Sequence, residues 1–131
     1  MILALDTSTP ITELLLTDRS GKILKQIKVE IGNQLSEQLL QIIEDALKDA
    51  NHELSGLTGL IFVSGPGSFT GLRIGASTIN ALAYSLNIPV VGIPMGPNWL
   101  IKGLARLNNM EDDKIVKLKY GAEANITKQR K

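Results

Sequence analysis

The chain has 131 residues, of which 44% are hydrophobic and 21% charged, a balance typical of one globular domain that buries about two thirds of its unfolded surface. Its formal charge of +1 creates no overall field that would attract nucleic acid, and the lack of cysteine excludes disulfides and thiolate metal sites. No apolar run approaches the roughly 20 residues that span a bilayer and no signal-peptide pattern opens the chain, so we expect a cytoplasmic protein without membrane contact.

Three strands are predicted at the start of the chain. Met1 to Leu5 is a short apolar strand that ends at the polar run Asp6-Thr7-Ser8-Thr9-Pro10. Ile11 to Thr17 and Lys22 to Glu30 follow as two strands joined by the turn Asp18-Arg19-Ser20-Gly21. This pattern favours an antiparallel hairpin, and the looser alternation of its second strand indicates the outer strand of a sheet.

An amphipathic helix is predicted from Asn33 to Ala50, with Asn33 or Ser36 as its N-cap. The apolar side of the helix is formed by Leu35, Leu39, Ile42, Ile43, Ala46 and Ala50. Leu40 and Leu47 widen this side beyond what covering one sheet face requires. Either the following connection through Leu54 and Leu57 folds over the surplus, or a second protein covers it.

A buried strand, a glycine-rich turn and a helix are predicted next, without a break between them. Leu60-Ile61-Phe62-Val63 is continuously apolar, as in a parallel sheet covered by helices. Ser68 or Thr70 caps the predicted helix, which runs from about Gly71 to Leu86. Val90 to Ile93 forms the next strand, so that strand, helix and strand make a right-handed parallel crossover.

The glycine-rich turn fits none of the common enzyme fingerprints. Thr70 stands where a dinucleotide-binding loop needs its third glycine, no lysine follows as in a phosphate-binding P-loop, and Ser68 lacks the flanking glycines of a nucleophile elbow. A tight strand-to-helix turn is one interpretation. Anion binding at the helix N-terminus is the other.

The polar run after the first strand also allows two interpretations. Asp6 is either part of an Asx-type turn without a ligand or the anchor of a Mg²⁺-bound water, with the neighbouring hydroxyl groups facing phosphate. The second interpretation gives an alternative function: a small nucleotide- or anion-binding enzyme that uses the Gly65 to Gly71 loop and has its binding site at Asp6, Thr7, Ser8, Gly65 and Gly67.

The run Ser64-Gly65-Pro66-Gly67-Ser68-Phe69-Thr70-Gly71-Leu72-Arg73-Ile74-Gly75 resembles the signature of the TsaB family, a branch of the actin-like kinase and ATPase superfamily. The resemblance implies an α/β fold in which residues 1–93 form a single actin-like (ribonuclease H-like) lobe, a mixed β-sheet with helices packed on it. Residues 94–131 are then a remnant C-terminal segment with a short helix from about Trp99 to Leu107 and a basic tail after Tyr120. A usual TsaB chain has a second lobe, so we expect a shortened form.

The same resemblance implies a function in making threonylcarbamoyladenosine (t6A) in tRNA. The chain is expected to be a non-catalytic scaffold that dimerises with a TsaD-like enzyme and activates it, with a TsaE-like ATPase as a further partner and tRNA contacted only indirectly. No cofactor is expected in the chain itself, because ATP and magnesium belong to the partner enzyme or to a shared interface. Leu35-Ser36-Glu37 lacks the histidine that opens this motif in the family, and the lone His52 is expected to be exposed, so no metal site is predicted.

Two neighbouring helices supply the predicted interface with the TsaD-like partner or with a second copy of the chain. Gly75 in a helix interior costs roughly 0.8–1 kcal/mol relative to alanine, which predicts the close approach of another backbone, from the first helix or from a partner. Arg73 either binds a partner carboxylate or lies in water. A homodimeric module with some other partner remains an alternative. The predicted interface residues are Leu40, Ile43, Leu47, Gly71, Leu72, Arg73, Gly75, Thr78 and Leu82.

Overall fold

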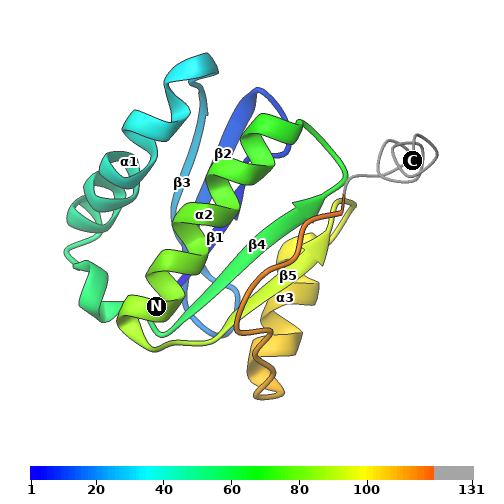
Figure 1. Ribbon diagram of the computed structural model, residues 1–131. Helices are drawn as coiled ribbons and strands as arrows, with labels where there is room; N and C mark the ends of the chain where they lie inside the picture. The colour runs from blue at the N-terminus through cyan, green and yellow to red at the C-terminus, as the bar shows by residue number, and fades with distance from the viewer. Residues whose placement is uncertain (120–131) are drawn as a thin grey trace.

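The computed structural model describes residues 1–119 as a mixed sheet with helices on both faces (Figure 1). The predicted basic tail after Tyr120 lies outside the described residues. The strands of the sheet are β1 (Ile2–Asp6), β2 (Ile11–Thr17), β3 (Ile23–Glu30), β4 (Gly59–Gly65) and β5 (Val90–Pro94).

The strand order of the sheet is β3-β2-β1-β4-β5. β2 pairs antiparallel with both β1 and β3, whereas β4 pairs parallel with both β1 and β5. This arrangement confirms the predicted hairpin, the outer position of β3 and the α/β class with a mixed sheet. Because β1 and β4 run in parallel, the loops that follow them meet at one end of the sheet.

Helices cover both faces of the sheet. α1 (Leu35–Asp49) and α2 (Phe69–Leu86) pack on one face, and α3 (Trp99–Asn108) packs on the other (Figure 1). The predicted cap of α2 is confirmed, because the Ser68 hydroxyl accepts a hydrogen bond from the Gly71 amide. The predicted cap of α1 is wrong: a 3₁₀ turn at Gly32–Gln34 runs directly into the helix, whose N-cap Gln34 makes no side-chain cap bond.

The apolar core forms one layer on each side of the sheet. Side chains alternate between the two faces of a strand, so neighbouring residues of β1 enter different layers. Leu3 and Leu5 face α1 and α2, whereas Ile2 and Ala4 face α3, and all four are fully buried. The central strands are therefore covered on both sides, as the apolar run of β4 predicts.

Candidate functional site

The loop after β1 forms a closed polar turn. Asp6 Oδ1 accepts a hydrogen bond of 2.8 Å from the Ser8 amide and a second one from the Ser8 hydroxyl. Thr7 and Ser8 are buried, with exposed fractions of 0% and 2%. This is the Asx-type turn of the first interpretation, in which the aspartate oxygen satisfies the backbone of its own loop.

The same loop packs directly against the glycine-rich turn and the start of α2. The Thr7 hydroxyl donates to the Gly71 carbonyl at 2.7 Å, and the Ser68 amide donates to the Ser8 carbonyl at 2.7 Å. A Cβ atom at Gly67 would lie 2.7 Å from the Ser8 Cβ, and one at Gly71 would collide with the Thr7 carbonyl oxygen. The backbone that approaches these glycines is therefore the chain's own, so the structure brings Asp6, Thr7, Ser8 and Gly67 together.

Gly65 has a structural role at the end of β4. Its φ angle of +106° favours glycine, and a Cβ atom there would lie 2.9 Å from the Leu72 side chain. The glycine thus lets β4 turn sharply into the loop before α2.

Gly75 lies where α2 comes closest to the sheet. A Cβ atom at this position would collide with the Thr7 hydroxyl and lie 2.7 Å from the Phe62 ring. The close approach predicted from Gly75 is therefore made by the β1 loop and by β4, and neither α1 nor a partner chain is needed to explain this glycine.

Five of the nine predicted interface residues are buried in the chain's own core. These five residues are buried because the sheet and the connection through Leu54 and Leu57 cover the inner sides of α1 and α2. Leu40 and Arg73 are exposed, and Gly71 and Thr78 are partly exposed. The buried five are Ile43, Leu47, Leu72, Gly75 and Leu82.

The outer side of α2 carries an exposed row of side chains, here called the outer row of α2: Phe69, Arg73, Ser77, Ala81 and Tyr84. Residues three or four apart share a helix face, which brings these side chains into line. Phe69 is 53% and Tyr84 90% exposed, so the row has an aromatic group at each end and small residues in its middle. The Arg73 guanidinium lies over the Phe69 ring, 5.1 Å from its centre, in a cation–π contact.

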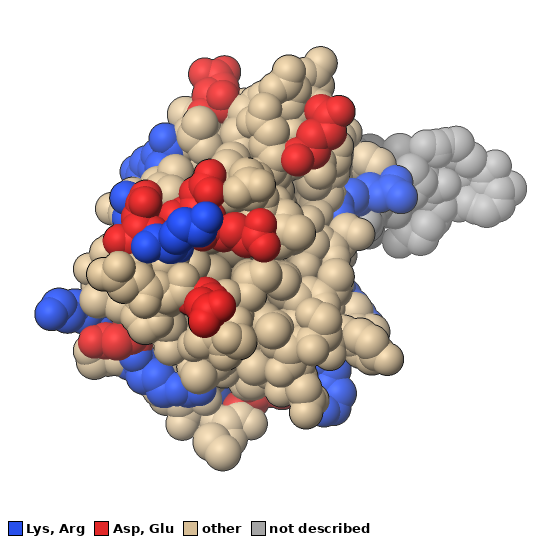
Figure 2. All heavy atoms as spheres, turned by 90° about the vertical axis from the view of Figure 1, so that its left-hand side faces the viewer, with Lys and Arg blue, Asp and Glu red and all other residues tan. Residues whose placement is uncertain are grey.

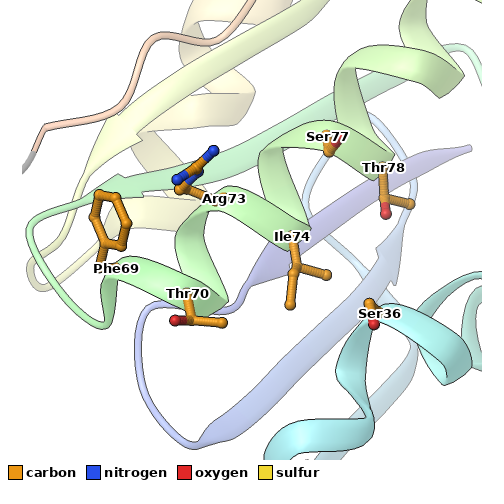
Figure 3. A pocket seen from close by; sticks show the side chains of 7 residues that line it. All are labelled: Ser36, Phe69, Thr70, Arg73, Ile74, Ser77 and Thr78. Atoms are coloured by element: carbon orange, nitrogen blue, oxygen red, sulfur yellow. The ribbon is translucent and has the colours of Figure 1, made fainter.

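A groove of about 550 Å³ runs along α2 toward the start of α1 (Figure 3). It is lined by Ser36 from α1 and by Phe69, Thr70, Arg73, Ile74, Ser77 and Thr78 from α2. Figure 3 shows Thr78 on the side of α2 that faces Ser36, whereas Arg73 projects from the other side of the helix. The groove contains none of the five residues predicted for nucleotide binding.

Charge is distributed unevenly over the two helices. Arg73 is the single charged residue of α2, whereas α1 carries Glu37, Glu44, Asp45, Lys48 and Asp49. Figure 2 shows acidic side chains gathered on the face that contains α1, next to a wide area without charge. A partner that covers the outer row of α2 therefore has to desolvate little charge.

Phe69 and Tyr84 are the surface residues that the sequence-based prediction missed. The predicted helix began at Gly71, two residues late, so Phe69 fell in the loop. The spacing from Phe69 through Arg73, Ser77 and Ala81 repeats every four residues, and this outward repeat was the available signal.

The described residues offer no metal centre and no membrane-spanning helix. Among residues 1–119, no three His, Asp or Glu side chains gather as metal ligands, and His52 is exposed. Within the same range, no helix is both long and apolar enough to cross a bilayer.

The sequence of the chain is similar to proteins of tRNA threonylcarbamoyladenosine biosynthesis. A sequence model described as "TsaD: tRNA N6-adenosine threonylcarbamoyltransferase" matches residues 29–96. The tRNA threonylcarbamoyladenosine biosynthesis protein TsaB of Haemophilus influenzae is 35% identical over 92 residues, which cover 70% of this chain and 38% of that protein. The tRNA N6-adenosine threonylcarbamoyltransferase of Geotalea daltonii is 46% identical over 57 residues, which cover 44% of this chain and 17% of the enzyme.

A solved structure gives the same relationship in three dimensions. YeaZ from Pseudomonas aeruginosa superimposes with a TM-score of 0.65 at 33% identity, over 71% of this chain and 43% of that one. The chain thus spans less than half the length of the relatives that it matches. The sequence match, the family model and the shared actin-like lobe agree, and the chain belongs to the TsaB (YeaZ) family.

Proposed function

We propose that this chain acts in the biosynthesis of threonylcarbamoyladenosine in tRNA, as a non-catalytic subunit that binds and activates a TsaD-like enzyme. The observation that carries the proposal is the match to a protein named for this pathway, 35% identical over 70% of the chain. The wider relationship to threonylcarbamoyltransferases supports a partner of that kind.

We assign the contact with the partner to the outer row of α2, the adjoining groove and Leu40 of α1. Leu40 is 45% exposed although it lies on a helix whose other leucines are buried. Exposed aromatic groups at both ends of the row are typical anchors of a protein interface, and the small side chains between them allow a partner helix to approach closely.

Catalysis is assigned to the partner rather than to this chain. The match to the Geotalea daltonii transferase covers 17% of that enzyme. The Asp6 carboxylate already accepts two hydrogen bonds from Ser8, and the Ser8 backbone lies directly against Gly67, where a Cβ atom would collide with the Ser8 carbonyl oxygen. We therefore propose that the chain binds no nucleotide by itself, and that ATP and magnesium are held by the partner or at the shared interface.

Self-association and enzyme binding compete in this proposal, because both use the outer row of α2. One side of a helix can be buried by one partner at a time. A TsaE-like ATPase then joins through the TsaD-like subunit or at the edge of the pair, and tRNA is bound by the enzyme.

The test is co-expression of the chain with the TsaD-like protein of the same organism, followed by size exclusion and mass spectrometry of the tRNA nucleosides. We expect a complex and a rise in threonylcarbamoyladenosine. Arg73→Glu should weaken the complex by about tenfold to a hundredfold, because it reverses the single charge of α2 within the interface. Arg19→Glu in the exposed β2–β3 turn is the matched control and should leave the affinity unchanged.

Two outcomes would contradict parts of this proposal. If the wild-type chain neither binds the enzyme nor changes the level of the modified nucleoside, the assigned function is wrong. If Arg73→Glu and Arg19→Glu bind equally well, the function stands but the assigned surface is wrong.

A further inference from the structure

β5 is an edge strand whose outer side pairs with no other strand of the described sheet. Nevertheless, the outward-facing amide and carbonyl groups of Val90 and Gly92 all have hydrogen-bond partners. The Val90 amide donates to Asp112 Oδ1 at 3.1 Å and the Gly92 amide to Asp113 Oδ2 at 2.8 Å. The Val90 carbonyl accepts from the Asp113 amide at 2.8 Å and the Gly92 carbonyl from Arg106 Nη1 at 3.1 Å. Pro94, the next outward residue, has no amide hydrogen.

Arg106 holds the acidic loop after α3 in this position. Its Nε donates to Glu111 Oε1 at 2.6 Å and its Nη1 to Asp113 Oδ2 at 3.1 Å, while its Nη2 donates to the other oxygen of Asp113. The guanidinium therefore binds the Asp113 carboxylate through two nitrogens, the geometry in which arginine and carboxylate form their strongest pairs. The side chains of Arg106 and Asp113 are each 30% exposed, so water reaches the pair only in part.

The chain then passes around the edge of β5 from one face of the sheet to the other. α3 lies on one face, and Val116 belongs to the core on the opposite face, beside α2. The Val116 amide donates to Asn80 Oδ1 at 2.9 Å, and the Lys119 amide donates to the Ser64 carbonyl at 2.9 Å. Figure 1 shows this segment running beside β5 up to the last described residue.

β3, the strand at the opposite edge of the sheet, is protected by charged side chains instead. β3 and the turn before it carry Lys22, Lys25 and Lys28, and exposed lysine is a common guard of an edge strand because a docking strand would have to bury its charge. β5 has the sequence Val-Val-Gly-Ile-Pro, which contains no charge. Without Arg106 and the loop of Asp112 and Asp113, its free amide and carbonyl groups would be a template for another strand.

We propose that Arg106, Asp112 and Asp113 form an edge lock, which occupies the outer hydrogen-bonding groups of β5 and prevents this strand from pairing with a strand of a second copy of the chain. Arg106, Asp112 and Asp113 lie outside residues 29–96, the part matched by the family model, whereas the Val90 and Gly92 groups that they bind lie inside it. The inference does not rest on the proposed function, because its evidence is the hydrogen bonding of β5, although Asp112 lines one groove together with Ala81 and Tyr84 of the outer row of α2.

The test uses the full chain with the double variant Arg106→Gln and Asp113→Ala, which removes the ion pair of the edge lock and its side-chain hydrogen bonds to Gly92. Hydrogen exchange measured by NMR should become about tenfold faster at the Val90 and Gly92 amides and stay unchanged at Ile61 in the sheet centre. Sedimentation velocity should show concentration-dependent association that is stronger than that of the wild-type chain. Arg19→Gln is the matched control, because Arg19 also contacts α3, through Asn108, but away from β5.

A second variant keeps the test decisive if the double variant does not fold. Arg106→Lys keeps the positive charge but cannot bridge Glu111, Asp113 and the Gly92 carbonyl together. It should fold, by circular dichroism, and show faster exchange at Val90 and Gly92. Unchanged exchange at these two amides in a folded variant would overturn the proposal, as would new dimers that form while both amides remain as protected as in the wild type.

Discussion

At Gly75 helix α2 lies so close to the sheet that there is no room for a side chain. The Thr7 hydroxyl and the Phe62 ring occupy the space where a Cβ atom would be. A glycine in a helix interior costs stability by itself, and here the cost is offset by the close packing of α2 on β4 and on the loop after β1.

We predict that Gly75→Ala lowers the free energy of unfolding by about 2–3 kcal/mol, because the added methyl group displaces Thr7 or Phe62 from the core. Urea denaturation followed by circular dichroism measures the effect. Ser77→Ala on the exposed side of the same helix is the control and should change stability by about 0.5 kcal/mol or less. A Gly75→Ala chain as stable as the wild type would show that α2 packs less closely than described. A larger residue at this position is therefore a test of the core and not of a partner interface.

Asp113 makes the stability of the chain depend on pH. Burial opposes its ionisation, but the hydrogen bonds from Arg106 and Gly92 and the charge of Arg106 outweigh burial and hold the pKa of Asp113 below its ordinary value of 3.8. In return, the hydrogen bonds to Asp113 and Glu111 raise the pKa of Arg106. The other charged groups of this loop, Asp112 and Lys114, form an exposed pair of 3.7 Å.

A carboxylate with a lowered pKa stabilises the folded state above the pKa that it has in the unfolded chain, and this contribution is lost as the pH falls through the folded value. We therefore predict that Asp113→Asn is less stable than the wild type at pH 7, and that the difference shrinks below about pH 4. Urea midpoints measured across this range test the prediction. Asp45→Asn on the exposed side of α1 serves as the control. If the difference in stability between Asp113→Asn and the wild type stayed constant with pH, the assignment would be contradicted.

At the scale of elements, the first turn of α2 is capped by the side chain of Ser68. The Ser68 hydroxyl accepts a hydrogen bond from the Gly71 amide at 3.3 Å, and this amide has no partner within the helix. We predict that Ser68→Ala destabilises the chain by about 1 kcal/mol, whereas Thr70→Ala, two residues further on and exposed, has a much smaller effect. Equal urea midpoints for Ser68→Ala and the wild type would show that the helix start is held by other contacts.

The elements were predictable from the sequence where the signal is local. The β2 boundaries, the outer position of β3, the Ser68 cap and the crossover from β4 through α2 to β5 all follow from periodicity and turn residues within a short window. The predicted α1 cap failed because a 3₁₀ turn continues into the helix, which side-chain preference alone does not reveal.

The two sides of α2 show why the candidate site was predictable only in part. Gly71 and Gly75 were placed in an interface because glycines on a helix indicate close approach, but spacing does not say which part of the chain approaches. The partner is the loop at Thr7, more than sixty residues away in sequence, and such long-range contacts are not readable from local pattern. The edge lock was missed for the same reason, since Arg106 and Asp113 gain their role from Val90 and Gly92.

For the whole molecule, the chain itself covers both faces of the sheet and one of its two edges. The sheet is covered on one face by α1 and α2 and on the other by α3, and the edge lock occupies the rim of β5. Arg73, Ser77, Ala81 and Tyr84 of the outer row of α2 are exposed, and the groove beside them is lined by residues of α2 and by Ser36 of α1. A TsaD-like partner that binds as proposed should therefore protect one side of the molecule and leave the other unchanged.

We predict this footprint for hydrogen–deuterium exchange of the chain with and without its TsaD-like partner. Peptides covering residues 36–40 and 69–84 should exchange more slowly in the complex, because the partner excludes water from their backbone and restricts their local opening. Peptides covering α3 should not change, since α3 packs on the opposite face of the sheet from α2. Protection confined to α3 or to β3 would place the partner on the other face of the sheet or at its β3 edge, and would contradict the assigned surface. Protection at α1 and α2 that disappears in Arg73→Glu but persists in Arg19→Glu would tie the footprint to the single charge on α2.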